Sequence, residues 1–268
     1  MNIDRPFVDV RACWQPAGSR SSHGADGRLP AILPFVLVLL LASLLSGCGG
    51  GSSGSGGYAD RPPSDRVALT AWQEWTRFGR STVVYGGQAG GYVNRRGVSE
   101  RSEPLSSKIG DYWGSCGHPS WNGRTSKPWS GAFVTWVMSH SDISAKEFPR
   151  DGRHGGYLAT LYDRQRIGGR PAFVLHAPNE YSPRPGDLVC TGSAGPTWRH
   201  ADSRTARRRI DHTASHCDIV TDVRGGFVQA VGGNVKDSVS MSLYPVDSRG
   251  RLRPVPGKTW FMVVEKRV

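Results

Sequence analysis

The pattern of hydrophobic and polar positions divides the chain into a helical first part and a strand-rich last part. After Asp65, a residue that can cap a helix, apolar residues recur at helical spacing until Gly79. Three more segments show helical periodicity or helix-start signals: Ser102 to Trp113, Ser130 to about Ser139, and His154 to Arg166.

Strand-like patterns begin after the turn signal Pro183-Arg184-Pro185-Gly186 and predict strands at 187–190, 216–223, 227–231, 238–244 and 260–265. Helices followed by an antiparallel meander predict an α+β fold. Two stretches are predicted to be loops: the glycine-rich segment 86–97 and the polar segment 191–215. The second carries Arg207, Arg208 and Arg209, so it is either a solvated insertion or an anion-binding site.

The N-terminus has the pattern of a bacterial lipoprotein precursor. Residues 1–47 combine an arginine-containing stretch with a short apolar run that contains Pro30 and Pro34, which favours a secretory signal over a membrane span. Leu45-Ser46-Gly47-Cys48 resembles the lipobox, in which the cysteine is lipidated; the alternative is an ordinary signal peptide. Gly49 after the cysteine resembles the outer-membrane sorting class, which implies a lipid-anchored protein facing the periplasm.

Residues 48–64 form a linker rich in glycine and serine, and residues 65–268 have the length of one domain. The formal net charge of +12 suits an anionic partner such as peptidoglycan or lipid phosphates, although solubility accounts for it equally well. Export argues against nucleic acid as a partner. Cys190 and Cys217 lie in two strand candidates. An exported protein meets an oxidising compartment, so these cysteines can form a disulfide; the alternative is two buried thiols.

Three residues suggest a catalytic site. Ser130 opens an apolar helix, His216 lies in a strand candidate, and Asn234 follows the end of another. Nucleophile, base and orienting residue are assembled in this order in papain-like hydrolases.

Four short motifs extend this resemblance from about Ser102 to the C-terminus. They are Pro128-Trp129-Ser130-Gly131-Ala132-Phe133-Val134, Pro185-Gly186-Asp187-Leu188-Val189-Cys190, His216-Cys217-Asp218-Ile219-Val220 and Gly232-Gly233-Asn234-Val235. The chain resembles the papain-like peptidoglycan hydrolases of the NlpC and CHAP groups, and more nearly the bacterial family called domain of unknown function 2272. The resemblance implies a papain-like fold and hydrolysis of cell-wall amide bonds, with Ser130 where the relatives have cysteine.

Each candidate residue also has a structural interpretation. Ser130 is a good N-cap residue, His216 fits an ordinary strand histidine, and Asn234 fits a turn with positive φ. Trp129 and His154 are candidate ligand-binding residues, with His154 either lining the cleft or capping its helix. The histidines show no metal-ligand spacing, so neither a metal nor a cofactor is predicted.

The sequence therefore supports two hypotheses. The first is a peptidoglycan amidase or endopeptidase that uses Ser130, His216 and Asn234. The second is a non-catalytic relative that binds peptidoglycan or another anionic envelope component through the same cleft.

Overall fold

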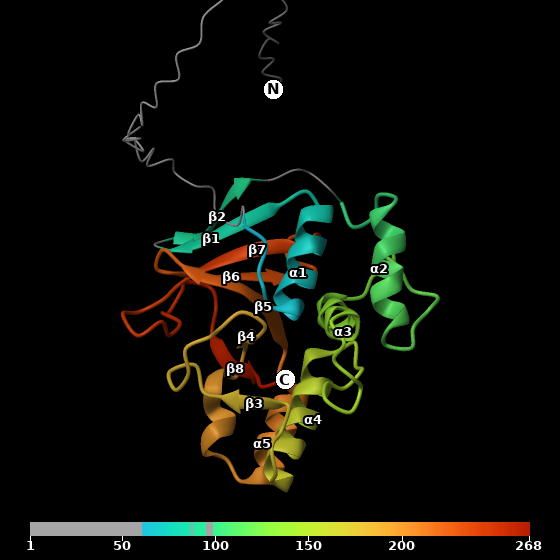
Figure 1. The fold of residues 1–268 in the computed structure, drawn as a ribbon. Coiled ribbons are helices and arrows are strands. Elements are labelled where there is room, and N and C mark those ends of the chain that lie inside the picture. The colour runs from blue at the N-terminus through green and yellow to red at the C-terminus, as the bar shows by residue number, and fades with distance from the viewer. Residues whose placement is uncertain (1–60, 87, 95–98) are drawn as a thin grey trace, which may run out of the picture. The chain divides into compact units, whose positions relative to one another are not determined.

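An eight-stranded sheet forms the framework of the domain, in the order β2-β1-β7-β6-β5-β4-β8-β3 (Figure 1). The computed structural model describes residues 61–86, 88–94 and 99–268. The predicted signal segment 1–47, the lipidation site Cys48 and the linker up to residue 60 lie outside the described residues.

The strands of this sheet pair antiparallel with one exception, the parallel pair β1–β7. This arrangement confirms the predicted α+β class. The strand bounds are β1 Ser81–Gly86, β2 Gln88–Asn94, β3 Phe173–His176, β4 Leu188–Gly192, β5 Ser215–Arg224, β6 Phe227–Gly232, β7 Ser240–Pro245 and β8 Trp260–Lys266.

The helices include the four that the sequence predicts. They are α1 Arg66–Arg77, α2 Leu105–Gly114, α3 Ser130–His140, α4 His154–Ile167 and α5 Ser203–His212, with a 3₁₀ helix, η1, at Gly195–His200. The predicted cap of α1 is confirmed, since the Asp65 side chain accepts a hydrogen bond of 3.0 Å from the Ala68 amide. Helices α1 and α3 pack against β5 and β6, and α4 packs against α5 (Figure 1).

Two loop predictions are wrong. Segment 86–97 contains β2, and segment 191–215 contains η1 and α5. Helix α5 has only Ala206 and Ile210 buried, four positions apart, so its apolar pattern is too sparse to stand out in a polar sequence. Asp202 starts this helix by accepting hydrogen bonds from the amides of Arg204 and Thr205.

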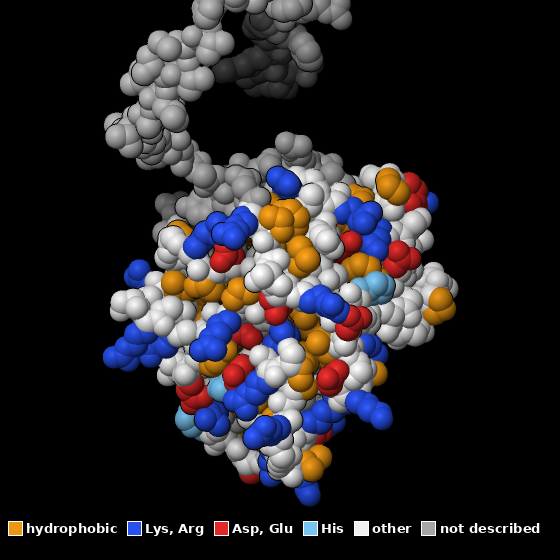
Figure 2. Space-filling model, in the orientation of Figure 1, with side chains coloured by type: hydrophobic (Ala, Val, Ile, Leu, Met, Phe, Trp, Pro, Cys, Tyr) orange, Lys and Arg blue, Asp and Glu red, His pale blue; other side chains and the backbone are white. Residues whose placement is uncertain are grey.

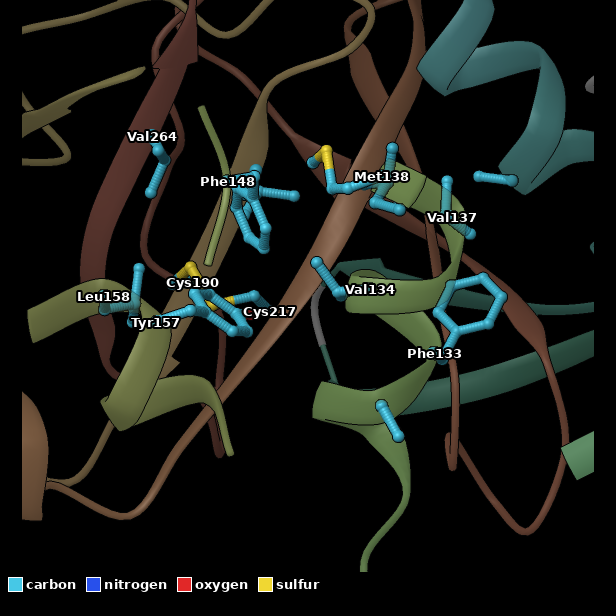
Figure 3. Close-up of a cluster of buried hydrophobic side chains, with 14 of the residues drawn as sticks. Phe133, Val134, Val137, Met138, Phe148, Tyr157, Leu158, Cys190, Cys217 and Val264 are labelled. Atoms are coloured by element: carbon cyan, nitrogen blue, oxygen red, sulfur yellow. A yellow bond between two sulfur atoms is a disulfide. The ribbon is translucent and has the colours of Figure 1, made fainter. Parts of the chain in front are cut away.

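The core holds the disulfide between Cys190 of β4 and Cys217 of β5, which confirms the bridged alternative. The two residues are directly paired in the antiparallel register of these strands. Figure 3 shows the bridge among side chains from α3 and α4, including Val134, Tyr157 and Leu158. The bridge thus joins two neighbouring strands of the sheet and is buried under side chains of α3 and α4.

All described residues belong to one compact unit. In this part of the chain, no helix has the length and apolar character that crossing a membrane requires.

Candidate functional site

Ser130 is the first residue of α3, and its hydroxyl is turned away from the helix. Trp129 is the N-cap residue and makes no side-chain capping hydrogen bond. The interpretation of Ser130 as the cap is therefore wrong. Its Oγ lies 2.7 Å from Nε2 of His154, and the serine is 7% exposed.

His154 opens α4 and joins Ser130 to a phenol. Its Nδ1 lies 2.5 Å from the hydroxyl oxygen of Tyr157. Burial, and secondly the electrostatic interaction with His216, lower the pKa of His154 to about 3, against a smaller opposing effect of Asp218. The imidazole of His154 is therefore neutral at pH 7, with one nitrogen protonated.

The phenol decides which nitrogen of His154 carries the proton. Burial raises the pKa of Tyr157 far above its ordinary value, so the hydroxyl keeps its hydrogen. Within the described residues, Nδ1 of His154 is the hydrogen-bond partner of this hydroxyl. When the phenol donates to Nδ1, the proton of His154 is on Nε2, which then donates to Ser130.

A second histidine, His216, is held by a buried carboxylate. His216 and Asp218 are two residues apart on β5, so their side chains share a face of the strand. Nε2 of His216 lies 2.7 Å from Oδ1 of Asp218, and the hydroxyl of Tyr244 donates to Oδ2 at 2.6 Å. Nδ1 of His216 is then the nitrogen left to accept a proton.

Asp218 remains ionised although it is 1% exposed. Burial would raise the pKa of Asp218, but the electrostatic interaction and hydrogen bond with His216, together with Lys258 and Tyr244, outweigh burial and lower this pKa. A carboxylate that orients and charge-stabilises an imidazole is the support that a catalytic histidine needs.

Gly232 at the end of β6 leaves the space in which this pair lies. A Cβ atom at position 232 would lie 1.8 Å from Oδ1 of Asp218 and 3.1 Å from Nε2 of His216. Any side chain here would displace the carboxylate. Gly232, two residues before Asn234, thus makes room for Asp218 as the partner of His216.

Asn234, predicted to orient His216, lies in the turn after β6 with a φ of 57°. No hydrogen bond from its side chain is found in the described part of the chain, and Asp218 occupies the partner position on His216. The sequence does carry a signal for Asp218, because His216-Cys217-Asp218 places two polar side chains on one face of a strand.

The two histidines bring these groups into one cluster. The ring of His216 meets that of His154 edge to face, with centroids 5.4 Å apart. Among the described residues, the hydrogen bond of Ser130 goes to His154, and none joins it to His216. His154 thus contacts both the predicted nucleophile, Ser130, and the predicted base, His216.

A cavity of about 480 Å³ opens above Ser130 and His154, a size that suits a small ligand or part of a larger one. We call it the Ser130 cavity. Its walls carry aromatic rings and charges of both signs, from Trp113, His118, Trp121, Lys127, Asp151, Arg153 and Asp211. No cluster of three or more metal-binding side chains occurs in the residues that the structure describes.

The other predicted binding residues lie outside this cavity. Trp129 is 1% exposed in the core and donates from Nε1 to Glu100 at 2.7 Å. Arg207, on the exposed side of α5, pairs with Asp163 at 2.8 Å, and Arg209 donates to the Thr197 carbonyl at 3.0 Å. Arg208 is exposed beside them. Figure 2 shows many Lys and Arg side chains at the lower end, where Figure 1 places α4 and α5.

Comparison with known proteins gives one match. A family model described as "Uncharacterized protein conserved in bacteria (DUF2272)" matches residues 99–264. This range contains every residue of the site. The searches of curated proteins and of solved structures found no match.

Proposed function

This chain belongs to the DUF2272 family, and we propose that it is a serine hydrolase with a papain-like site that cleaves amide bonds of cell-wall peptides. The observation that supports this proposal most directly is the convergence of three groups. The Ser130 hydroxyl and the neutral His154 line the cavity and are hydrogen-bonded to each other, and the His216–Asp218 pair adjoins them through the edge-to-face contact of the two imidazoles.

Of the two histidines, His216 is the better general base. Protonating His154, whose pKa is near 3, costs roughly 5 kcal/mol more than protonating a histidine with the ordinary pKa near 6.5. This cost is prohibitive for a general base at neutral pH. His216 has the ionised Asp218 on Nε2, and within the described residues no hydrogen bond is found to its Nδ1. In the proposed reaction the Ser130 side chain rotates from His154 toward Nδ1 of His216, which takes the hydroxyl proton as Oγ attacks the carbonyl carbon.

His154 then serves as a hydrogen-bond donor to the reacting oxygen. Its Nε2–H is freed when Ser130 rotates away, and it stays neutral because burial disfavours the charged form. The amides of the first turn of α3 have no partners within the helix and point to the same end. Together these donors stabilise the negative charge that develops on the carbonyl oxygen. His216 gives its proton to the leaving amine, which leaves the acyl group as an ester on Ser130. Water that gives a proton to His216 then attacks this ester, and His216 returns the proton to Ser130 Oγ as the acid is released.

Lipidation at Cys48 would place this activity at the inner face of the outer membrane, next to peptidoglycan. Cysteine sulfur suits such a helix terminus better than serine oxygen, because a thiol with a pKa near 8.5 can be held as thiolate and a serine hydroxyl cannot. We therefore expect the enzyme to be slow.

One observation favours the second hypothesis, a non-catalytic relative that binds envelope components through the same cavity. Ser130 is hydrogen-bonded to a histidine that does not accept its proton in the tautomer that Tyr157 favours. If that bond is permanent, Ser130 and His154 serve only to fix the ends of α3 and α4.

Replacing Ser130 with cysteine separates the roles of the two histidines. We expect Ser130→Cys to hydrolyse peptidoglycan fragments faster than wild type. The gain should disappear with His216→Ala and persist in part with His154→Gln, since the glutamine amide can still donate a hydrogen bond. His200→Ala, an exposed histidine outside the cavity, is the matched control. Loss of activity with His154→Gln and retention with His216→Ala would contradict this assignment.

A further inference from the structure

A second depression adjoins the Ser130 cavity on the side of α2. It lies between α2, the segment that follows it and α3, and has a volume of about 820 Å³. We call it the α2–α3 groove. Its lining includes Ser115, Ser120, Trp121, Asn122, Ser139 and His140. Trp121 lines both depressions, so a long ligand lying in one would pass over this ring into the other.

Trp121 is fixed in place by its neighbours. Its ring stacks on that of His118 at 4.1 Å between centroids with an interplanar angle of 5°, and it meets Trp113 edge to face at 4.8 Å. Trp121 and His118 are both half-buried, so they keep exposed surface in a rigid arrangement. Such a surface offers apolar contact at little cost in side-chain entropy.

Polar groups surround this aromatic surface. The Oδ1 atom of Asn122 accepts from the Arg124 amide, which leaves the side-chain NH₂ group for a ligand. Nδ1 of His140 lies 2.9 Å from the Trp136 carbonyl, which leaves Nε2. Ser120, the residue before Trp121, is exposed and adds a hydroxyl group. The groove thus combines one flat apolar surface with several hydrogen-bonding groups.

The charges of the groove favour an uncharged ligand. Lys108 and Asp111, both in its lining, pair with each other at 3.4 Å. The Lys108 ammonium also lies 3.9 Å from the centre of the Trp136 ring. None of the strands in the described part of the chain borders the groove, so these strands offer it no edge to which an extended peptide could add.

We propose that the α2–α3 groove binds a neutral oligosaccharide across Trp121. A sugar ring has an apolar C–H face that matches an indole and a rim of hydroxyl and amide groups that matches Asn122, His140 and Ser120. The Ser130 cavity then receives the part of the same molecule that extends beyond the sugar. This inference deepens the proposed hydrolase, because it identifies the substrate as a glycan that carries a peptide.

The test is direct binding of chitotetraose, the tetramer of N-acetylglucosamine, to the Ser130→Ala protein by calorimetry. Without the nucleophile, the measurement is independent of catalysis, so an inactive Ser130 would leave its result intact. We expect Trp121→Ala to weaken binding about 3- to 10-fold, the size of an aromatic contact, and Trp121→Phe to retain most of it. His140→Ala should weaken binding, and the exposed His200→Ala, outside both depressions, should leave it unchanged.

Three results would overturn the proposal. They are the absence of chitotetraose binding at millimolar concentration, binding that Trp121→Ala leaves unchanged in a folded protein, and binding of an uncharged alanine-containing tetrapeptide in place of the sugar. Circular dichroism and thermal unfolding of each variant establish that the fold is intact.

Discussion

Nε2 of His154 lies 2.7 Å from Oγ of Ser130, at the meeting point of the N-terminal ends of α3 and α4. This contact joins a candidate nucleophile to a histidine that burial keeps neutral. With its proton on Nε2, His154 acts as a hydrogen-bond donor to Ser130 and not as a base. The base function passes to His216, whose own partner is the buried carboxylate of Asp218.

The buried His154 makes stability depend on pH. Its pKa is about 3 in the folded protein and near 6.5 when unfolded, so its contribution to stability is complete above pH 6.5 and is lost as the pH falls toward 3. At pH 5 we expect a loss of roughly 2 kcal/mol relative to pH 7.5 from this group. Urea unfolding at both pH values checks this, with His154→Gln as the control that lacks the titrating group. An equal pH dependence in wild type and His154→Gln would show that His154 does not titrate in this way.

The disulfide between Cys190 and Cys217 should stabilise the domain by reducing the entropy of the unfolded chain. Its sequence separation of 27 residues corresponds to about 3.5 kcal/mol in the chain-entropy model. Replacing both cysteines with alanine should lower the free energy of unfolding by about this amount. Denaturant unfolding without reductant measures the difference. A change below 1 kcal/mol would mean that the surrounding packing, and not the bridge, holds β4 and β5 together.

The elements of the fold differ in how clearly their sequences predict them. Helix α1 was predictable because Asp65 and the apolar spacing agree, and the Cys190–Cys217 pairing was one of two open alternatives. Strand β3 and helix α5 were missed because short or largely polar elements depend on tertiary packing for their stability. Such elements leave a weak periodic signal.

The site was predictable only in part, for a physical reason. Ser130 and His216 stood out by type and position, whereas His154 and Asp218 gain their roles from three-dimensional placement. His154 is brought to Ser130 by the close approach of the first residues of α3 to the segment before α4, across 24 residues of sequence; a Cβ atom at Gly131 would lie 2.3 Å from the Gly152 carbonyl oxygen. Asp218 reaches His216 only because Gly232 on the next strand lacks a side chain.

Lipidation of Cys48 predicts that the protein fractionates with membranes. The Cys48→Ala variant should lose this localisation, because no anchor would remain after signal cleavage. Membrane fractionation and mass determination of the mature N-terminus provide the measurement. Wild-type protein that is soluble in the periplasm with an unmodified N-terminus would exclude lipidation.

The arginines of α5 should give salt-sensitive binding to an anionic envelope surface. Arg208 has the exposed charge that suits this role, while Arg207 is paired with Asp163 and Asp211. Replacing Arg207, Arg208 and Arg209 with alanine should weaken sedimentation with isolated sacculi, most clearly at low salt, since exposed charges are screened within about 8–10 Å at physiological ionic strength. Arg249→Ala, on the distant β7–β8 connection, serves as a control. Unchanged sedimentation of the triple variant at low salt would mean that these charges only solvate the helix.

The most direct test of the proposed hydrolase is the hydrolysis of purified peptidoglycan fragments by wild type, Ser130→Ala and Ser130→Cys, followed as the release of new amino groups. We expect slow release by wild type, none by Ser130→Ala and faster release by Ser130→Cys, because the terminus of α3 and His216 favour a thiolate. Inactivity of both wild type and Ser130→Cys, in folded proteins that still bind sacculi, would exclude the hydrolase and leave binding of envelope components as the function of this site.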